Sequence, residues 1–304
     1  MQRFSATDLK NVYSPYHRPV GQVRPGESFQ IETEDGFAGG LRKPEDLTPE
    51  RLAWCEERWC IVTGPIAVEG AKPGDVVAIT IHSIEVTTPG IVIMSRYRDP
   101  SPDDWWLDSE FDRLHTYEVR DGFLQFNHRL RLPARPLIGC LATAPKHEVV
   151  LSRREGDFGG NQDCNLMTVG STIVLPVNAE GGLVYFGDCK VMMGDGELVN
   201  APECGTLITA TAEIRPRPKA MRWPRVETET SYTTVVSYIS AADACRQAFR
   251  ELMMWIEEET AGNRQEIAML MGMVANAGIC QVSNTFHTAQ CTIDREYLPY
   301  LAHG

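Results

Sequence analysis

The chain lacks any long apolar run. A membrane-spanning helix needs about 20 consecutive apolar residues, and no stretch of the 304 residues approaches that length. Residues 1–4 lead into mixed polar sequence, without the apolar segment of a secretory leader. We therefore expect no membrane partner and no export.

Positive charge is also scarce. The chain has 41 Asp and Glu against 29 Lys and Arg, which gives a formal net charge of −12, and no region gathers its basic residues into a stripe. Proteins that bind nucleic acid or anionic membranes use basic surfaces for this purpose. The composition therefore argues against nucleic acid as a partner.

Paired cysteine spacing is absent as well. The nine cysteines are an odd number, scattered without a CxxC motif or a zinc-finger arrangement with histidine. Unpaired cysteines are typical of a reducing compartment, so we expect a cytoplasmic protein. The hydrophobic fraction of 43% is ordinary for a globular chain with a substantial core.

The most informative stretch covers residues 156–197. Its β-branched segments, residues 171–177 and 183–186, flank the turn 178–182 and predict a β-hairpin. Alternating segments at 28–33 and 206–214 and a segment of β-branched residues at 76–84 predict further strands.

Acidic residues beside glycines mark the turns of the same stretch. Asp163 ends the run Gly-Gly-Asn-Gln-Asp, Asp188 follows the second predicted strand, and Asp195 and Glu197 belong to the run Gly-Asp-Gly-Glu. Carboxylates at strand ends are rigidly held yet reachable, which suits metal binding or general acid–base catalysis. The alternative is that Asp and Gly are there only as turn formers.

Three separated motifs in this stretch resemble the acetamidase/formamidase family of bacteria and fungi. The first is a GGN-x-D turn at 159–163. The second is a segment at 170–177 that begins with Gly-Ser and ends with Leu-Pro-Val. The third, at 187–197, begins with Gly-Asp and ends with Gly-Asp-Gly-Glu. Residues 63–75, which contain Glu69, match another family segment nearly residue for residue. One departure stands out, because Lys190 occupies the position where the family usually has a histidine.

The strand pattern and the resemblance together predict a mainly β fold. We expect a β-sandwich or barrel-like N-terminal part at residues 1–214 that carries the acidic site. An α+β C-terminal part should occupy residues 215–304, with two helices within 240–277. A short helix is expected at 48–54, with Thr48 as its N-cap.

The resemblance implies a hydrolase that cleaves the C–N bond of a small linear or cyclic carboxamide and releases ammonia or an amine. It also implies a site associated with zinc or another divalent metal, and we expect a homo-oligomer. The catalytic residues expected are Glu69, Asp163, Asp188, Lys190 and Glu197. The substrate-binding residues expected are Asn161, Asp195 and Trp105, and Asp163 and Asp188 are the expected metal ligands.

Lys190 leaves the chemistry of this site open. A protonated lysine is not a metal ligand and repels a cation. Either the acids hold a metal with another nitrogen such as His17, or no metal is bound and the ammonium takes over its electrostatic task. Cys189 or Cys164 could then be the nucleophile. The competing class is a non-catalytic small-molecule binder descended from the amidases. In the metal-free case Lys190 should point at Asp163, Asp188 or Glu197.

Overall fold

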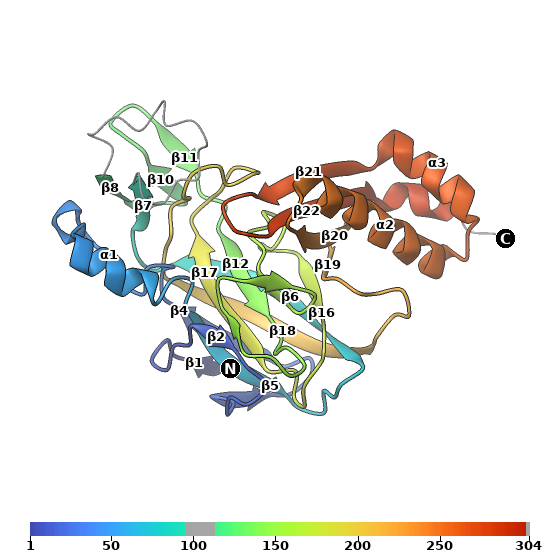
Figure 1. Ribbon diagram of the computed structural model, residues 1–304, viewed down its shortest axis with the longest axis horizontal. Helices are drawn as coiled ribbons and strands as arrows, with labels where there is room; N and C mark the ends of the chain where they lie inside the picture. The colour runs from blue at the N-terminus through green and yellow to red at the C-terminus, as the bar shows by residue number, and fades with distance from the viewer. Residues whose placement is uncertain (95–112, 302–304) are drawn as a thin grey trace.

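Two β-sheets form the body of the protein, as seen in a computed structural model that describes residues 1–94 and 113–301 (Figure 1). The nine-stranded sheet has the order β1 (Gln2–Phe4), β4 (Ser28–Thr33), β18 (Thr206–Pro216), β6 (Asp75–Val86), β16 (Thr172–Pro176), β19 (Arg225–Glu227), β20 (Ser231–Tyr238), β22 (His287–Asp294) and β21 (Asn276–Gln281). The six-stranded sheet has the order β14 (Glu155–Gly156), β15 (Gly159–Asn161), β12 (Leu137–Ala142), β17 (Val184–Lys190), β5 (Val62–Val68) and β3 (Gly21–Val23).

The structure also contains shorter strands and helices outside these two sheets. The small strands are β2 (Val12–Tyr13) paired with β13 (Val150–Leu151), β7 (Gly90–Met94) paired with β8 (Arg113–Tyr117), and the group β9 (Val119–Arg120), β10 (Phe123–Gln125) and β11 (Arg131–Pro133). The α-helices are α1 (Pro49–Glu56), α2 (Ala241–Thr260) and α3 (Arg264–Val274), and two short 3-10 helices lie at Pro44–Asp46 and Arg295–Tyr300. The mainly β prediction is confirmed.

The two sheets share one apolar core. Ile79 of β6 and Ile173 of β16 belong to the same buried cluster as Leu141 of β12 and Phe186 of β17. Every residue of β5, β12 and β17 is buried, which shows that this sheet is covered on both faces. Each large apolar side chain buried here contributes about 1.5–3 kcal/mol of transfer free energy. The core therefore holds β17 in place, and β17 is the strand that contains Asp188 and Lys190.

Helix α2 has one apolar face, and that face packs on the far end of the nine-stranded sheet. Ser240 caps the helix by accepting a hydrogen bond from the Asp243 backbone N–H. Trp255 stacks on Tyr232 of β20, with ring centroids 4.2 Å apart. The two predicted C-terminal helices are confirmed, as is the short helix after Thr48. Strands from both sides of residue 214 join this one sheet, and the division at that residue stays a prediction.

The predicted hairpin of residues 171–186 is wrong. Both strands exist, but β16 pairs with β6 and β19, whereas β17 pairs with β12 and β5 in the other sheet. The turn between them therefore crosses from one layer to the next. Local sequence could not show this, because both strands are buried and find their partners far away in the chain.

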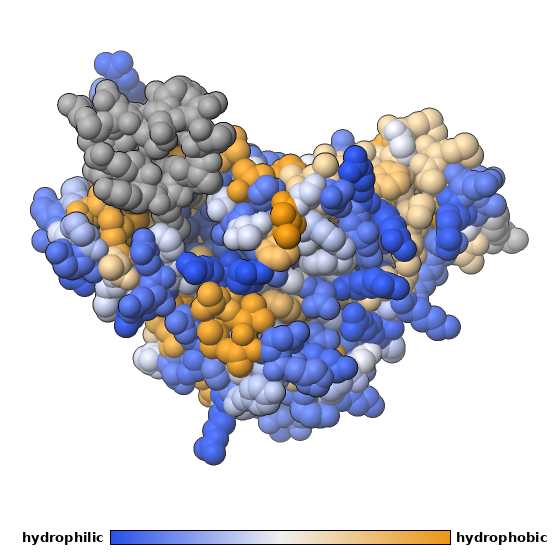
Figure 2. Space-filling model, viewed as in Figure 1, coloured by the Kyte–Doolittle hydropathy of each residue, from blue (hydrophilic) through white to orange (hydrophobic). Residues whose placement is uncertain are grey.

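No helix in the two described ranges is long and apolar enough to cross a membrane. Polar side chains cover most of the face drawn in Figure 2, and apolar ones gather in patches near its centre.

Candidate functional site

Strand β17 places two charged side chains in one cavity. Asp188 and Lys190 are two residues apart, so they project from the same face of the strand, and both line a cavity of about 370 Å³. Cys189 between them belongs to the main apolar core on the other face. This alternation puts the acid and the amine beside each other.

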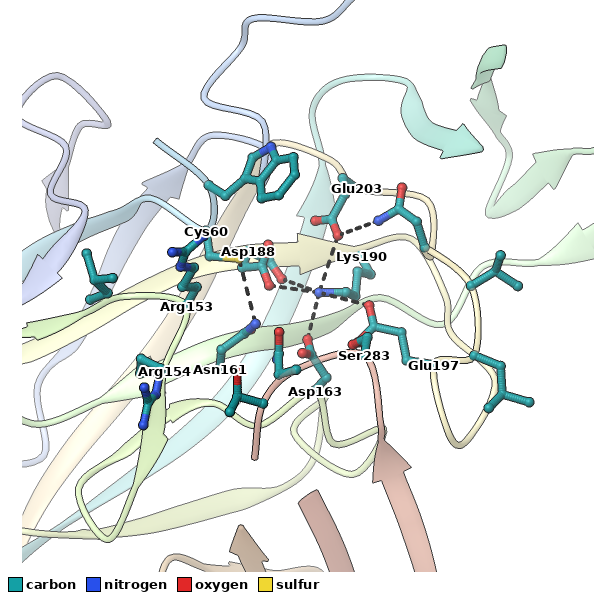
Figure 3. Close-up of a pocket in the computed structure, with 17 residues that line it drawn as sticks. Cys60, Arg153, Arg154, Asn161, Asp163, Asp188, Lys190, Glu197, Glu203 and Ser283 are labelled. Atoms are coloured by element: carbon teal, nitrogen blue, oxygen red, sulfur yellow. Dashed lines mark hydrogen bonds and ion pairs between the residues drawn. The ribbon is translucent and has the colours of Figure 1, made fainter. Parts of the chain in front are cut away.

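Lys190 is the centre of a buried ionic cluster (Figure 3). Its side chain is 1% exposed, and its Nζ lies 2.6 Å from Asp163 Oδ1 and 2.8 Å from Asp188 Oδ2. Two glutamates are somewhat farther, with Glu203 Oε1 at 3.4 Å and Glu197 Oε1 at 3.8 Å. One ammonium thus faces four carboxyl groups, and the expectation that Lys190 points at the acids holds.

These four acids arrive from separate parts of the fold. Asp163 follows β15, Glu197 lies in the loop after β17 beside the bridge between Gly196 and Gln281, and Glu203 forms a bridge with Lys190 just before β18. Asn161 of β15 lines the same cavity. The C-terminal loop between β21 and β22 contributes Ser283, whose Oγ donates to Glu197 Oε2 at 3.1 Å.

The surroundings set the protonation of the cluster. Burial raises the pKa of Asp163 well above its ordinary value, and the Glu197 carboxylate adds to this. Burial also raises the pKa of Glu203 well above its ordinary value, and Asp188 acts in the same direction. Burial alone would lower the pKa of Lys190, but the surrounding carboxylates raise it. The amine therefore stays an ammonium, while part of the acids hold protons.

The backbone of the site is unusual. Asp163, Asp188 and Glu197 have φ angles of 45°, 53° and 39°, in the left-handed region that favours glycine. Each such residue costs about 1–3 kcal/mol and persists only where its surroundings over-determine it. Cys60, with φ of 57°, also lines the cavity. Backbone strain is therefore concentrated here.

Two glycines leave the room that the cluster occupies. A Cβ on Gly139 of β12 would lie 2.8 Å from Lys190 Nζ and 2.5 Å from the carbonyl oxygen of Asp188. A Cβ on Gly36 would lie 2.8 Å from Glu203 Oε2 and would overlap the Asp188 carboxylate. The carboxylates and the ammonium can approach only because both positions lack a side chain.

We predict that Gly139→Ala displaces the ammonium. Its backbone tolerates alanine, so the effect arises from space alone, and overpacking of this kind costs about 1–3 kcal/mol of unfolding free energy. Gly194→Ala is the matched control, since no atom of the described residues lies within 4 Å of a Cβ there. Urea unfolding should show a destabilisation of Gly139→Ala only. Equal stability of both variants would contradict the packing argument.

Two sequence-predicted residues lie outside this cluster, and a third is not among the described residues. Glu69 follows β5 and does not line the cavity; its side chain is 56% exposed and lies 3.5 Å from Arg24. The expectation that it shares the cleft is wrong, because a glycine-marked turn at a strand end also occurs on the outside of the molecule. Asp195 accepts a hydrogen bond from Asn165 and is absent from the cavity lining. Trp105 lies outside the described residues.

The alternative ligand and nucleophiles also lie elsewhere. His17 Nδ1 is hydrogen-bonded to the Tyr185 hydroxyl at 3.0 Å and does not line the cavity. Cys189 and Cys164 belong to the apolar core, and burial raises the pKa of Cys189 to about 11. A thiolate at Cys189 is therefore disfavoured.

Sequence reasoning missed other cavity residues. Glu203 stands in a Pro-Glu-Cys-Gly turn before a long strand, which is the same signal that identified the other acids. The further lining residues are Trp59, Cys60, Leu151, Arg153, Arg154, Leu198, Val199, Asn200, Ser283, Asn284 and Thr285. No local pattern marks these, because the fold assembles them from distant loops.

The chain is similar to known proteins in both sequence and structure. The sequence model of the Acetamidase/Formamidase family matches residues 2–154 and 148–240. A solved structure of a predicted acetamidase/formamidase from Thermoanaerobacter tengcongensis is 29% identical, with a TM-score of 0.90, and the match covers 99% of this chain and 97% of that one.

Two curated relatives are more distant. A formamidase of Methylophilus methylotrophus is 22% identical over 62% of this chain, and an acetamidase of Mycolicibacterium smegmatis is 25% identical over 64%. The match covers 59% and 63% of the lengths of these two relatives.

Proposed function

The chain belongs to the acetamidase/formamidase family, and from this premise we propose that it hydrolyses the C–N bond of a small linear or cyclic carboxamide. The observation that carries the proposal is the single ammonium of Lys190 held among four carboxyl groups in a cavity of about 370 Å³. Amide hydrolysis needs a polarised carbonyl, an activated water and a proton for the departing nitrogen. This cluster contains a group for each task.

Lys190 is the proposed electrophile. Its ammonium would donate to the amide carbonyl oxygen and stabilise the negative charge that develops there when water attacks the carbon. Such preorganised donors contribute about 10²–10³ in rate where they have been removed from other enzymes. The raised pKa of Lys190 keeps it charged across the neutral range.

Glu197 is the proposed general base. Its Oε1 is 3.8 Å from Lys190 Nζ, the longest of the four separations, and its Oε2 is oriented by Ser283. It would take one proton from the attacking water. Asp163 or Glu203, whose pKa values are raised by burial, would give a proton to the leaving nitrogen as the C–N bond breaks. The products are a carboxylic acid and ammonia or an amine.

The donor set does not fit a metal. Within residues 1–94 and 113–301, no group of three or more His, Cys, Asp or Glu is arranged to hold a metal ion. The ammonium of Lys190 stands between the carboxylates that would be its ligands. We therefore derive no step through zinc, and propose that the ammonium supplies the positive charge of this site.

Release of ammonia from a panel of small linear and cyclic amides tests the proposal. We expect at least one amide to be hydrolysed with kcat/KM of about 10⁴ M⁻¹ s⁻¹ or more, before and after dialysis against a chelator. Loss of activity on chelation, restored by zinc, would overturn the metal-free site. Tight binding of an amide without release of ammonia would instead establish a small-molecule binder.

A further inference from the structure

The cavity carries opposite charges on its two sides. The acid–lysine cluster lies on one side, and Arg153 and Arg154 line the same cavity from the loop before β14. Figure 3 shows both arginines on the side of Cys60 and Asn161, across from Glu197. A ligand that spans this cavity therefore meets two guanidinium groups at one end and the cluster at the other.

Arg153 is exposed at the cavity, and its side chain has no hydrogen bond, ion pair or ring contact in the described part of the chain. An arginine fork is suited to a carboxylate, which it binds with two parallel hydrogen bonds.

Arg154 is held in place by stacking. Its guanidinium carbon lies 4.5 Å from the centre of the Phe286 ring, and its Nε is buried without a hydrogen-bond partner among the described residues. Stacking fixes the plane of a guanidinium and leaves its edge available for a planar anion.

We infer that the substrate is an amide that also bears a carboxylate, such as a monoamide of a short dicarboxylic acid. This rests on the proposed function and names the substrate class for the same site. The amide group would meet Lys190, and the carboxylate would meet Arg153 and Arg154, away from the acids that repel it. A cavity of about 370 Å³ has room for such a molecule. Water adds across the C–N bond, so each turnover yields one dicarboxylic acid and one ammonia.

The test compares two amides of equal chain length, the monoamide of butanedioic acid and neutral butanamide. The wild-type protein should prefer the carboxylated amide, and Arg153→Gln should lower the ratio of the two kcat/KM values by about 10- to 100-fold. Arg153→Lys keeps the charge without the fork and should retain part of the ratio. Arg246→Gln, on the exposed surface of α2, is the control and should keep the whole ratio.

The outcomes separate this inference from the proposed function. Hydrolysis of neutral amides with a ratio that Arg153→Gln leaves unchanged would overturn the inference and leave the amidase standing. If no amide is hydrolysed, calorimetry with the same monoamide decides. Arginine-dependent binding would support the carboxylate site while the hydrolase proposal fails, and absence of binding would overturn both.

Discussion

Lys190→Met should lower kcat/KM for the best amide substrate by about 10²–10³, the cost of removing one preorganised donor to the developing oxyanion. Methionine has a similar length and shape but carries no charge and donates no hydrogen bond. Lys72→Met, at an exposed position, is the matched control and should leave kcat/KM unchanged. Wild-type kcat/KM in Lys190→Met would refute the proposed role of the ammonium.

The same variant must be shown to fold. Removing one partner of a buried ion pair costs about 3–5 kcal/mol when the other charge is left behind. Asp163 and Glu203 bind protons readily here, since burial raises their pKa values. The cost should therefore shrink as the pH falls towards 5, and activity should be compared where circular dichroism shows both proteins folded.

A second variant keeps the experiment decisive if Lys190→Met does not fold. Glu197→Gln preserves the close pairs of Lys190 with Asp163 and Asp188, but it removes the proposed base. It should fold and lose about 10²–10⁴ in rate, the usual contribution of a general base. A fully active Glu197→Gln would assign the base to another carboxylate.

The fold was readable from sequence where one element carries its own signal. β4 and most of β18 alternate between buried and more exposed residues, and β6 is rich in β-branched residues. All three strands were predicted within two residues at either end. Helix α2 has a capping serine and a continuous apolar face. Such signals depend on a few neighbouring residues, so they can be recognised without knowing which strands or helices the element packs against. The pairing of β16 and β17 has no such local signal, and its prediction failed.

Part of the site could also be predicted from the sequence, because some of its residues have a local sequence signal. Asp163, Asp188 and Glu197 lie close to glycines in the sequence, and all three approach Lys190 as expected. Glu69 also lies beside a glycine, but its side chain is outside the cluster. Glu203 was not predicted, and its bridge to Lys190 brings it into the cluster. A turn signal shows that an acid is held rigidly, but only the packing of the sheets decides which acids converge.

Glu155 provides the clearest pH effect on stability. It lies in β14, is 6% exposed, and belongs to no pair with Lys190. Gln281 Nε2 donates to its Oε1 at 3.2 Å, while its Oε2 has no hydrogen-bond partner within residues 1–94 and 113–301. Burial raises the pKa of Glu155 from 4.5 to about 8. The folded protein therefore holds a proton here that the unfolded chain has already released.

Because the folded protein binds this extra proton, its stability relative to the unfolded chain falls as the pH rises. The stability that Glu155 contributes is fully present below pH 4.5 and is lost as the pH rises through about 8. Glu155→Gln replaces the carboxyl by a group of the same shape that never ionises. At pH 9 the variant should be more stable than the wild type by about 2–4 kcal/mol, and at pH 4 the two should be equal.

Urea unfolding at several pH values measures the difference directly. Glu180→Gln, at an exposed turn, is the control and should follow the wild type throughout. Some pH dependence must remain in Glu155→Gln, because Asp163 and Glu203 are shifted in the same direction. A variant that is less stable than the wild type at pH 9 would mean that the ionised carboxylate of Glu155 is needed in the folded protein, for which Arg154 and Asn284 would be the partners to test.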